Sequence, residues 1–326
     1  MSSPLISIII PVFNEEAVLG RLFERLYPVM DALGASYEVI FIDDGSADRS
    51  VALLRAQFER RPEVTRVVVF SSNFGQHNAI LAGFAHSRGE HVITLDSDLQ
   101  NPPEEIPHLI AALAAGHDYV GTIRKMRRDS LLRRWPSKFL NAIRERTTDI
   151  HITDQGCMMR AYSRSVIGAI NQCPEVNTFI PALAYLFARS PTEIEVAHEE
   201  RAAGASKYSF YRLLRLNFDL MTGFSIVPLQ LYSLLGLVIS GISFALFVLL
   251  MVRRLWLGAE VEGVFTLFSI VFFLLGILLI GVGLLGEYVG RTYAQVRGRP
   301  RYLVAAVLER SSQGEQSAAQ GAVLRA

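Results

Sequence analysis

Two long apolar stretches near the C-terminal end constrain the fold of this chain more than any other feature. They run from Leu229 to Val252 and from Val264 to Leu285, and neither contains an Asp, Glu, Lys or Arg. At roughly 1.5 Å per residue, each stretch is long enough as a helix to cross a bilayer core of about 30 Å. The alternative is a pair of helices buried in a soluble core, but such helices rarely exceed about 20 residues without a charge. The sequence therefore predicts a two-helix transmembrane hairpin.

Basic residues gather outside this hairpin rather than in its loop. Only Arg253 and Arg254 lie in the connecting loop, whereas seven basic residues flank the hairpin: Lys207, Arg212, Arg215, Arg291, Arg297, Arg299 and Arg301. Because short cytoplasmic segments are enriched in Lys and Arg, we expect both termini to be cytoplasmic. Six glycines in or beside the stretches predict close helix packing in lipid: Gly236, Gly241, Gly276, Gly281, Gly283 and Gly286.

The overall composition excludes several classes of protein. The 32 basic and 31 acidic residues nearly cancel, so net charge gives no reason to expect nucleic acid as a partner. The only two cysteines, Cys157 and Cys173, have neither a disulfide framework nor zinc-site spacing, and we expect both to be ordinary buried thiols.

The N-terminal half alternates short β-branched runs with segments of helical period. ISIIIPV, EVIFID, RVVVF and HVITLD predict strands, and Val18, Leu22, Leu26 and Val29 mark one face of a helix between the first two. This alternation predicts an α/β fold with a largely parallel sheet, in which ligands lie beyond the carboxyl ends of the strands.

Acidic and turn residues follow three of these strands. The first runs into PVFNEE (11–16), the second into DDGSADRS (43–50) and the fourth into DSDLQNPPEE (96–105). Alternation along an extended strand end would place Asp96, Asp98 and Gln100 on one side, where their oxygens suit Mg²⁺ or Mn²⁺. The alternative for DDGS is a turn with Ser46 or Asp48 capping the next helix. No GxxxxGK[ST] or GxGxxG motif follows the first strand, which argues against a P-loop kinase or a dinucleotide oxidoreductase.

Seven segments together resemble one enzyme family. PVFNEE, IDDGSADRS, NFGQHNAILAGF, DSDLQNPPEEIP, GTIR, DQGCMMRAY and RAAGASKYS are similar to family 2 glycosyltransferases of the GT-A fold, in the branch that transfers sugars to polyprenyl phosphate. Within that branch, GQHNAILAGF, DQGCMMRAY and NTFIPALA most resemble members that transfer 4-deoxy-4-formamido-L-arabinose in polymyxin resistance.

The resemblance implies roles for individual residues. Asp96, Asp98 and Gln100 match the metal segment, and Asp154 matches the acceptor-segment aspartate, as a catalytic base or as a positioning group. The matched substrate-binding positions are Pro11, Phe13, Glu15, Asp44 and Ser97 for the donor, and Arg124, Arg201 and Lys207 for phosphate groups of donor and acceptor. The family more often has tyrosine where this chain has Phe13. His77 is interpreted as a packing residue.

The patterns along the chain, taken with this resemblance, predict a domain organisation. We expect a catalytic domain over 1–205, an interfacial amphipathic helix over 206–227, the hairpin over 228–287, and a cytoplasmic C-terminal segment over 288–326 with a disordered tail. A second interfacial helix is expected around Leu132–Arg144, although either helix would also suit packing on the soluble domain.

The expected protein is a multi-pass enzyme of a bacterial inner membrane. It would move a sugar with inversion from a UDP-sugar to undecaprenyl phosphate, for modification of lipid A or another envelope glycan, with Mg²⁺ or Mn²⁺ as cofactor and as a homotetramer. Two alternatives stay open. One is transfer of glucose or mannose to undecaprenyl or dolichyl phosphate, and the other is a catalytically silent membrane protein that binds a partner.

Overall fold

The computed structural model describes residues 5–124, 152–154, 156–173, 179–199, 222, 226–257 and 264–310. The chain forms two compact units. One comprises residues 1–130, 150–206 and 299–326 and is an α/β unit, and the other comprises residues 131–149 and 207–298 and contains two long helices. The predicted Arg201, Lys207 and both interfacial helices fall largely or wholly outside the described residues.

The α/β unit is built on an eight-stranded sheet in the order β7-β5-β6-β4-β1-β2-β3-β8. The strands are β1 Ile6–Val12, β2 Tyr37–Asp43, β3 Thr65–Phe70, β4 His91–Thr94, β5 Tyr119–Arg124, β6 Arg160–Ser163, β7 Pro191–Val196 and β8 Val304–Leu308. Neighbours β4, β1, β2 and β3 are parallel, as are β5 and β7. β6 runs antiparallel to β4 and β5, and β8 runs antiparallel to β3.

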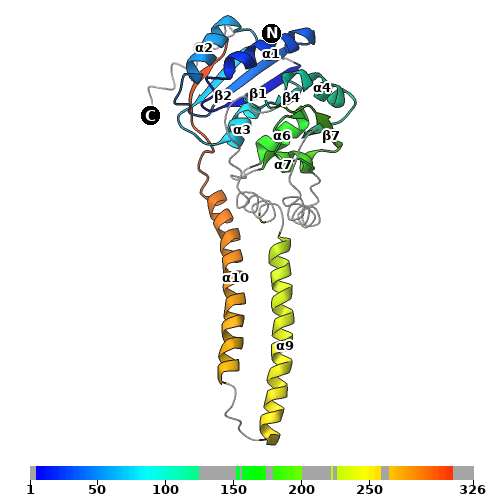
Figure 1. The fold of residues 1–326 in the computed structure, drawn as a ribbon, viewed down its shortest axis with the longest axis vertical. Helices are drawn as coiled ribbons and strands as arrows, with labels where there is room; N and C mark the ends of the chain where they lie inside the picture. Colours follow the sequence, from blue (N-terminus) through cyan, green and yellow to red (C-terminus); the bar gives the residue numbers. More distant parts are fainter. Residues whose placement is uncertain are drawn as a thin grey trace. The chain divides into compact units, whose positions relative to one another are not determined.

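Helices cover both faces of this sheet (Figure 1). They are α1 Leu19–Ala32, α2 Ser50–Arg60, α3 Gln76–His86, α4 Ile106–Ala114, α6 Arg164–Gln172 and α7 Ile180–Phe187, with a 3-10 turn η1 at Pro103–Glu105. Ile8 and Ile10 of β1 share a core with α1, α2 and α4. Between them, Ile9 points to the other face, where a Cβ at Gly83 of α3 would lie 2.3 Å from Ile9 Cγ2. Glycine at position 83 therefore lets α3 pack directly on β1.

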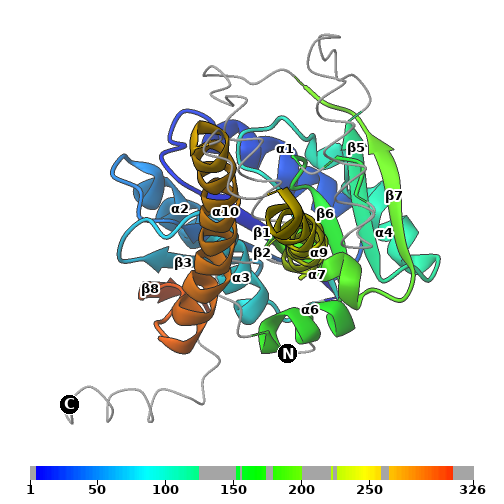
Figure 2. The same cartoon turned by 90° about the horizontal axis from the view of Figure 1, so that it is seen from below.

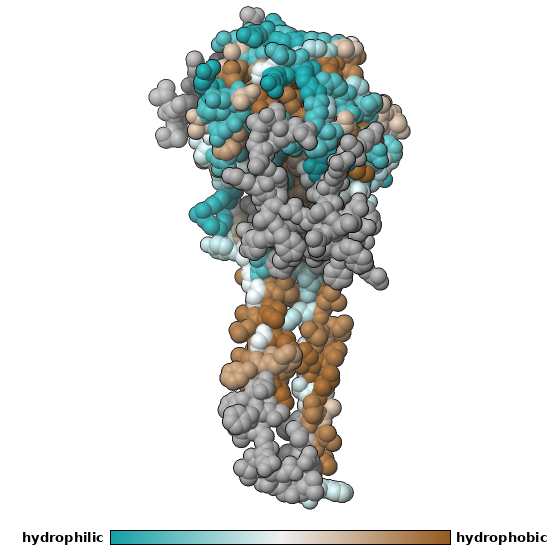
Figure 3. All heavy atoms as spheres, in the orientation of Figure 1, coloured by the Kyte–Doolittle hydropathy of each residue, from teal (hydrophilic) through white to brown (hydrophobic). Residues whose placement is uncertain are grey.

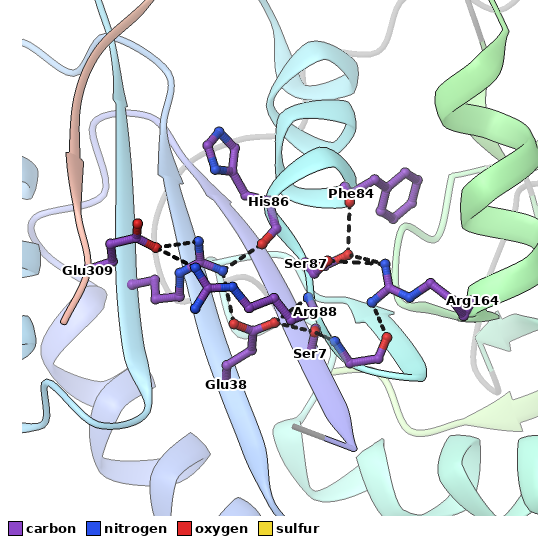
Figure 4. A network of polar contacts seen from close by, with 10 residues as sticks. Ser7, Glu38, Phe84, His86, Ser87, Arg88, Arg164 and Glu309 are labelled. Atoms are coloured by element: carbon purple, nitrogen blue, oxygen red, sulfur yellow. Dashed lines mark hydrogen bonds and ion pairs between the residues drawn. The ribbon is translucent and has the colours of Figure 1, made fainter. Parts of the chain in front are cut away.

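The strand β8 closes the β3 edge of the sheet, at the opposite edge from β7 (Figure 2). Leu308 pairs with Val67, and just beyond the strand the Glu309 carboxylate accepts hydrogen bonds from Arg66 at 2.8 Å and Arg88 at 2.9 Å (Figure 4). Arg66 also binds the buried Glu38 at 3.0 Å. Part of the segment expected to be a simple C-terminal extension is thus a strand of the sheet. Its five residues follow no pattern strong enough to predict this pairing.

Three sequence expectations about this unit need correction. The sheet is mixed rather than largely parallel, because RAYS and VAAVL form antiparallel strands. The fourth strand ends at Thr94, so Asp96 and Asp98 are not strand residues. Cys157 is buried as expected, but Cys173 is only half-buried. The other predicted strands and the α/β class of the fold are confirmed.

The second unit contains the two predicted apolar helices, α9 Val227–Leu257 and α10 Val264–Val296. Both contain windows that are long and apolar enough to cross a membrane, and their described surface is hydrophobic (Figure 3). The hydroxyl of Tyr232 on α9 donates to the Ile277 carbonyl on α10 at 2.9 Å. A Cβ at Gly281 would lie 2.0 Å from the Tyr232 ring. The other five glycines named above would meet nothing within 4 Å, so close packing is confirmed only at Gly281.

Candidate active site

The carboxyl ends of β1, β2 and β4 lie side by side at one edge of the sheet. Val12 pairs with Asp43 across β1 and β2, and Ile9 pairs with Thr94 across β1 and β4. Backbone hydrogen bonds continue past the strands, from Asp44 N to Val12 O at 2.8 Å and from Leu95 N to Ile9 O at 3.0 Å. The three acidic strand ends predicted from the sequence therefore meet, as parallel strands require.

The loops after β1 and β2 hold each other through side-chain to backbone hydrogen bonds. Asn14 N donates to Ser46 Oγ at 2.9 Å, Ala47 N donates to Asn14 Oδ1 at 2.8 Å, and Glu15 N donates to Ser50 Oγ at 2.9 Å. Asn14 adopts a left-handed φ of 56°, a conformation that asparagine tolerates better than most residues. These contacts leave the preceding Phe13 side chain 45% exposed at the sheet edge. Pro11, by contrast, is buried within β1.

Asp44 is buried and accepts two backbone hydrogen bonds from the loop after β3. Its Oδ1 accepts from Phe74 N at 2.7 Å and its Oδ2 from Gly75 N at 2.9 Å. Burial raises the pKa of Asp44 above its ordinary value, although the two hydrogen bonds oppose that rise. A Cβ at Gly45 would lie 2.5 Å from the Ser72 carbonyl carbon, so this approach of the two loops requires glycine.

The preceding residue, Asp43, has a different environment. Its Oδ2 accepts from Ser46 N at 3.0 Å, while its buried Oδ1 has no hydrogen-bond partner within the described part of the chain. An unpartnered buried carboxylate oxygen is costly, and a ligand or water donor would offset that cost. Asp43 therefore joins Asp44 as a candidate donor-binding residue, although only Asp44 was predicted.

Residues 95–100 form a turn rather than an extended strand end. Leu99 has a φ of 59°, and Gln100 N donates to Asp98 Oδ1 at 3.1 Å. Even so, Asp96, Asp98 and Gln100 are partly exposed, while the intervening Ser97 and Leu99 are buried. The shared exposure is as expected, but it comes from the turn and not from strand alternation.

A glutamine that the sequence interpretation left out contacts this turn. Gln76, the first residue of α3, donates from Nε2 to Asp96 Oδ1 at 2.7 Å. It lies inside the quoted NFGQHN segment, so the motif pointed to its position without identifying its role.

The neighbouring His77 packs its ring 5.8 Å from that of Phe179, and burial lowers the pKa of His77. This environment favours the predicted packing role of His77.

The chemistry of the turn suits a hard divalent cation. Among the residues that the structure describes, no group of three or more His, Cys, Asp or Glu side chains is arranged to hold a metal. Mg²⁺ and Mn²⁺, however, are often bound by one or two carboxylates plus substrate phosphates and water. The partly exposed carboxylates of Asp96 and Asp98 meet that requirement.

Arg124 and Asp154 form a two-point ion pair beside the turn. Arg124 Nε lies 2.6 Å from Asp154 Oδ2, and Nη2 lies 2.8 Å from Oδ1. Gly156 N donates to the same Oδ1 at 3.0 Å, and a Cβ at Gly156 would lie 2.9 Å from Arg124 Nη2. The structure thus brings together two residues that were predicted for separate roles.

A fully buried arginine supports the loop that holds Asp154. Arg160 donates from Nη2 to the Asp154 carbonyl at 2.7 Å and from Nε to the Cys157 carbonyl at 2.9 Å. It also contacts the Tyr119 hydroxyl. Sequence reasoning missed Arg160, because its burial depends on strand pairing between β4, β5 and β6.

The segment before Arg201 is anchored next to the acidic turn. Glu199 N donates to the Gln100 carbonyl at 2.9 Å, and Ala197 N donates to Glu105 Oε1 at 3.2 Å. Arg25 of α1 donates to both oxygens of Glu199 at 2.9 and 3.0 Å and to both oxygens of Glu104 at 2.8 and 2.9 Å. Glu199, two residues before Arg201, is therefore in direct contact with the turn 95–100.

Comparison with known proteins identifies the family. The sequence profile described as "Glycosyl transferase family 2" matches residues 7–170, which include all three acidic strand ends. The chain belongs to this family.

Several relatives of this glycosyltransferase are similar over nearly their whole length. Proteins named undecaprenyl-phosphate 4-deoxy-4-formamido-L-arabinose transferase are 50% identical in Pseudomonas paraeruginosa, covering 98% of this chain and 94% of that protein, and 50% identical in Shewanella sediminis, covering 93% and 92%. The Aeromonas hydrophila protein of the same name is 48% identical, covering 97% and 98%.

A solved structure confirms the fold of this glycosyltransferase. Glucosyl-3-phosphoglycerate synthase from Mycobacterium tuberculosis, in complex with uridine diphosphate, superposes with a TM-score of 0.50 at 18% identity, covering 67% of this chain and 78% of that one. The α/β unit accordingly has the GT-A glycosyltransferase fold.

Proposed function

We propose that this glycosyltransferase moves 4-deoxy-4-formamido-L-arabinose from a UDP-sugar to undecaprenyl phosphate, for modification of lipid A or a related envelope glycan. The observation that carries the proposal is the 50% identity to transferases named for that reaction over 98% of the chain, because it extends through both apolar helices. The acidic sheet edge, the Arg124–Asp154 pair and the apolar hairpin suit a polar donor and a lipid acceptor.

The donor nucleotide is assigned to the ends of β1 and β2. The exposed Phe13 ring offers a stacking surface for uracil, and Glu15 and Asp44 offer carboxylate acceptors for the nucleoside. Each oxygen of Asp44 already accepts one backbone N–H group, which leaves its second lone pair for the nucleoside and ties the loop after β3 to this site. The buried Pro11 and Ser97 are assigned to the walls of the site.

The diphosphate is assigned to the acidic turn. Asp96 and Asp98, with the Gln100 side chain beside them, are proposed to hold Mg²⁺ or Mn²⁺. When bound, such an ion stabilises the negative charge of the leaving diphosphate. Gln76 orients the Asp96 carboxylate through its hydrogen bond.

The acceptor phosphate is assigned to Arg124, Arg201 and Lys207. A phosphate oxygen attacks the anomeric carbon as the bond to UDP breaks, which inverts the configuration. With a second pKa of about 6, the acceptor phosphate is largely ionised near neutral pH and needs no strong base. Asp154 grips Arg124 at two points, so we assign it to positioning the guanidinium.

The membrane arrangement is a further part of the proposal. We assign α9 and α10 to a hairpin in a bacterial inner membrane, with both termini and the catalytic domain (1–205) cytoplasmic, an interfacial segment (206–227) before the hairpin (228–287), and a homotetrameric assembly. Reporter fusions at both termini test the orientation, and mass measurement in detergent tests the assembly.

The decisive experiment is to incubate detergent-purified protein with undecaprenyl phosphate and a panel of UDP- and GDP-sugars, with mass spectrometry of the lipid. We expect a product only with UDP-4-deoxy-4-formamido-L-arabinose. A product with UDP-glucose or GDP-mannose instead would reassign the donor, and no product with any donor would contradict the proposal.

A further inference from the structure

The segment 301–309, which follows α10 in the sequence, runs along the edge of β3 from Val67 to Phe70. Val304 pairs with Phe70 at one end and Leu308 with Val67 at the other. At the carboxyl end of β3, Ser71 N donates to the Leu303 carbonyl at 3.0 Å. At the opposite end, Glu309 is held by Arg66 and Arg88 (Figure 4). The segment is therefore attached at both ends of the strand.

Aromatic contacts continue from this segment into the loop after β3. The ring of Tyr302 stacks on that of Phe70, with centroids 4.9 Å apart and an interplanar angle of 11°. Phe70 in turn makes an edge contact with Phe74, with centroids 5.8 Å apart at 83°. Such pairs contribute beyond the area they bury because of their defined geometry. Tyr302 is thus linked through one ring to the middle of the loop.

The same loop contacts both parts of the proposed donor site. The backbone N–H groups of Phe74 and Gly75 donate to the two oxygens of Asp44, and the Gln76 side chain donates to Asp96. Gly75 has a φ of 93°, a conformation that requires glycine. A shift of Phe74 would move the donors on Asp44 and the start of α3 together.

The first half of the loop depends on contacts from outside it. Residues 71–73 are exposed, and the hydrogen bond from Ser71 N goes to the C-terminal segment rather than to a neighbour in the loop. Short exposed backbone with few buried contacts opens easily unless something outside it holds it. The Leu303 carbonyl and the rings of Phe70 and Tyr302 add this support to the hydrogen bonds that Asp44 and Asn78 make with Phe74 and Gly75.

We propose that segment 301–309 orders the loop 71–76 and through it the donor site, with Tyr302 as the positioning residue. This inference rests on the proposed function, since it assigns Asp44 and Asp96 to the nucleotide and its metal. It extends that function by making a segment beyond the apolar helices part of the catalytic domain's donor site.

The test uses the full-length protein in detergent. Tyr302→Ala removes the stacked ring, Tyr302→Leu keeps apolar volume without a flat face, and Tyr302→Phe keeps the stack. The matched control is Tyr293→Ala, which removes an exposed tyrosine from α10. Hydrogen exchange of residues 71–76 reports loop order, and calorimetric titration with UDP and Mg²⁺ reports the donor site.

We expect faster exchange at Phe74 and Gly75 and weaker UDP binding in Tyr302→Ala and Tyr302→Leu. The loss of one aromatic pair predicts a rise in Kd of roughly twofold to tenfold. Tyr302→Phe and Tyr293→Ala should match the wild type in both measurements.

The outcomes separate this inference from the proposed function. Unchanged exchange in Tyr302→Ala and Tyr302→Leu would overturn the inference, and so would faster exchange with an unchanged Kd for UDP. Failure of the wild type to bind UDP would overturn the proposed function instead, while the exchange comparison would still decide whether the segment orders the loop.

Discussion

Arg124 at the end of β5 and Asp154 before β6 bind each other through two parallel hydrogen bonds of 2.6 and 2.8 Å. Their side chains are 17% and 6% exposed, so the pair is largely removed from water. A planar guanidinium matched to a carboxylate in this way has one orientation, which a lysine could not reproduce. The two residues therefore form one structural unit, and a functional loss at either should reflect both.

A double-mutant cycle on this pair is the first prediction. Arg124→Ala and Asp154→Ala should each lower kcat/KM by roughly a hundredfold, and the double variant should lose no more than the worse single one, because the pair acts together. Each single variant should also lose about 3 kcal/mol of unfolding free energy through the unpaired buried charge. The control is Arg61→Ala in the exposed pair with Asp31, where we expect less than about 1 kcal/mol. Additive kinetic losses would mean independent roles.

Removal of the Gln76 amide should weaken metal binding. Gln76→Ala leaves the Asp96 carboxylate without the hydrogen bond that orients it, and such losses typically reduce metal affinity by about tenfold to a hundredfold. Titration of Mn²⁺ in the presence of UDP, followed by electron paramagnetic resonance, measures this directly. Gln295→Ala, which removes an exposed amide from α10, should leave the affinity unchanged. An unaltered Mn²⁺ affinity in Gln76→Ala would exclude the orienting role.

The pH dependence of stability should differ in sign between two aspartates of the DDGSAD segment. Burial raises the pKa of Asp44 in the folded protein. The contribution of Asp44 to the free energy of unfolding is therefore fully present below its pKa in the unfolded chain, about 3.9, and is lost as the pH rises through its pKa in the folded protein. Burial also opposes ionisation of Asp48, but hydrogen bonds from Ser50 and Glu16 outweigh it and lower the pKa. The contribution of Asp48 is therefore present above the unfolded pKa and is lost as pH falls.

Thermal unfolding of Asp44→Asn and Asp48→Asn in detergent, from about pH 3.5 to pH 7, tests these signs. Relative to the wild type, the apparent Tm of Asp44→Asn should improve as pH rises, and that of Asp48→Asn should worsen. Parallel trends in the two variants would show that one of the two environments is wrongly described.

In the helical hairpin, Gly281 should be far less tolerant of substitution than Gly276. A Cβ at Gly281 would collide with the Tyr232 ring, whereas a Cβ at Gly276 would meet nothing within 4 Å. We expect Gly281→Ala to destabilise the hairpin by about 1–3 kcal/mol through overpacking and Gly276→Ala to have little effect. Tyr232→Phe, which loses the hydrogen bond to Ile277, should cost about 0.6 kcal/mol. Equal effects of the two alanine substitutions on unfolding would argue against this contact.

Local sequence patterns were sufficient for the strands β1 to β3 and for the two apolar helices. Each of these elements has a pattern that runs through most of its residues. In Ile6–Val12 the pattern is a run of β-branched residues, and in Leu229–Val252 it is a long stretch without charged residues. Parallel pairing then placed PVFNEE, DDGS and DSD at one sheet edge without any knowledge of side-chain contacts. The meeting of these acidic segments at the candidate site was predictable for this reason.

Residue periodicity and strand direction were enough to predict the element types, the apolar hairpin and the acidic edge. The pairing of β8 with the sheet, the contact of Gln76 with Asp96 and the pairing of Arg124 with Asp154 became known from the three-dimensional structure. The residues in each of these contacts are at least 20 positions apart, and β8 and β3 are separated by more than 200. No local propensity encodes such a partner. It is selected by packing the whole domain, where burial makes an unpaired polar group costly and so favours the one arrangement that pairs it.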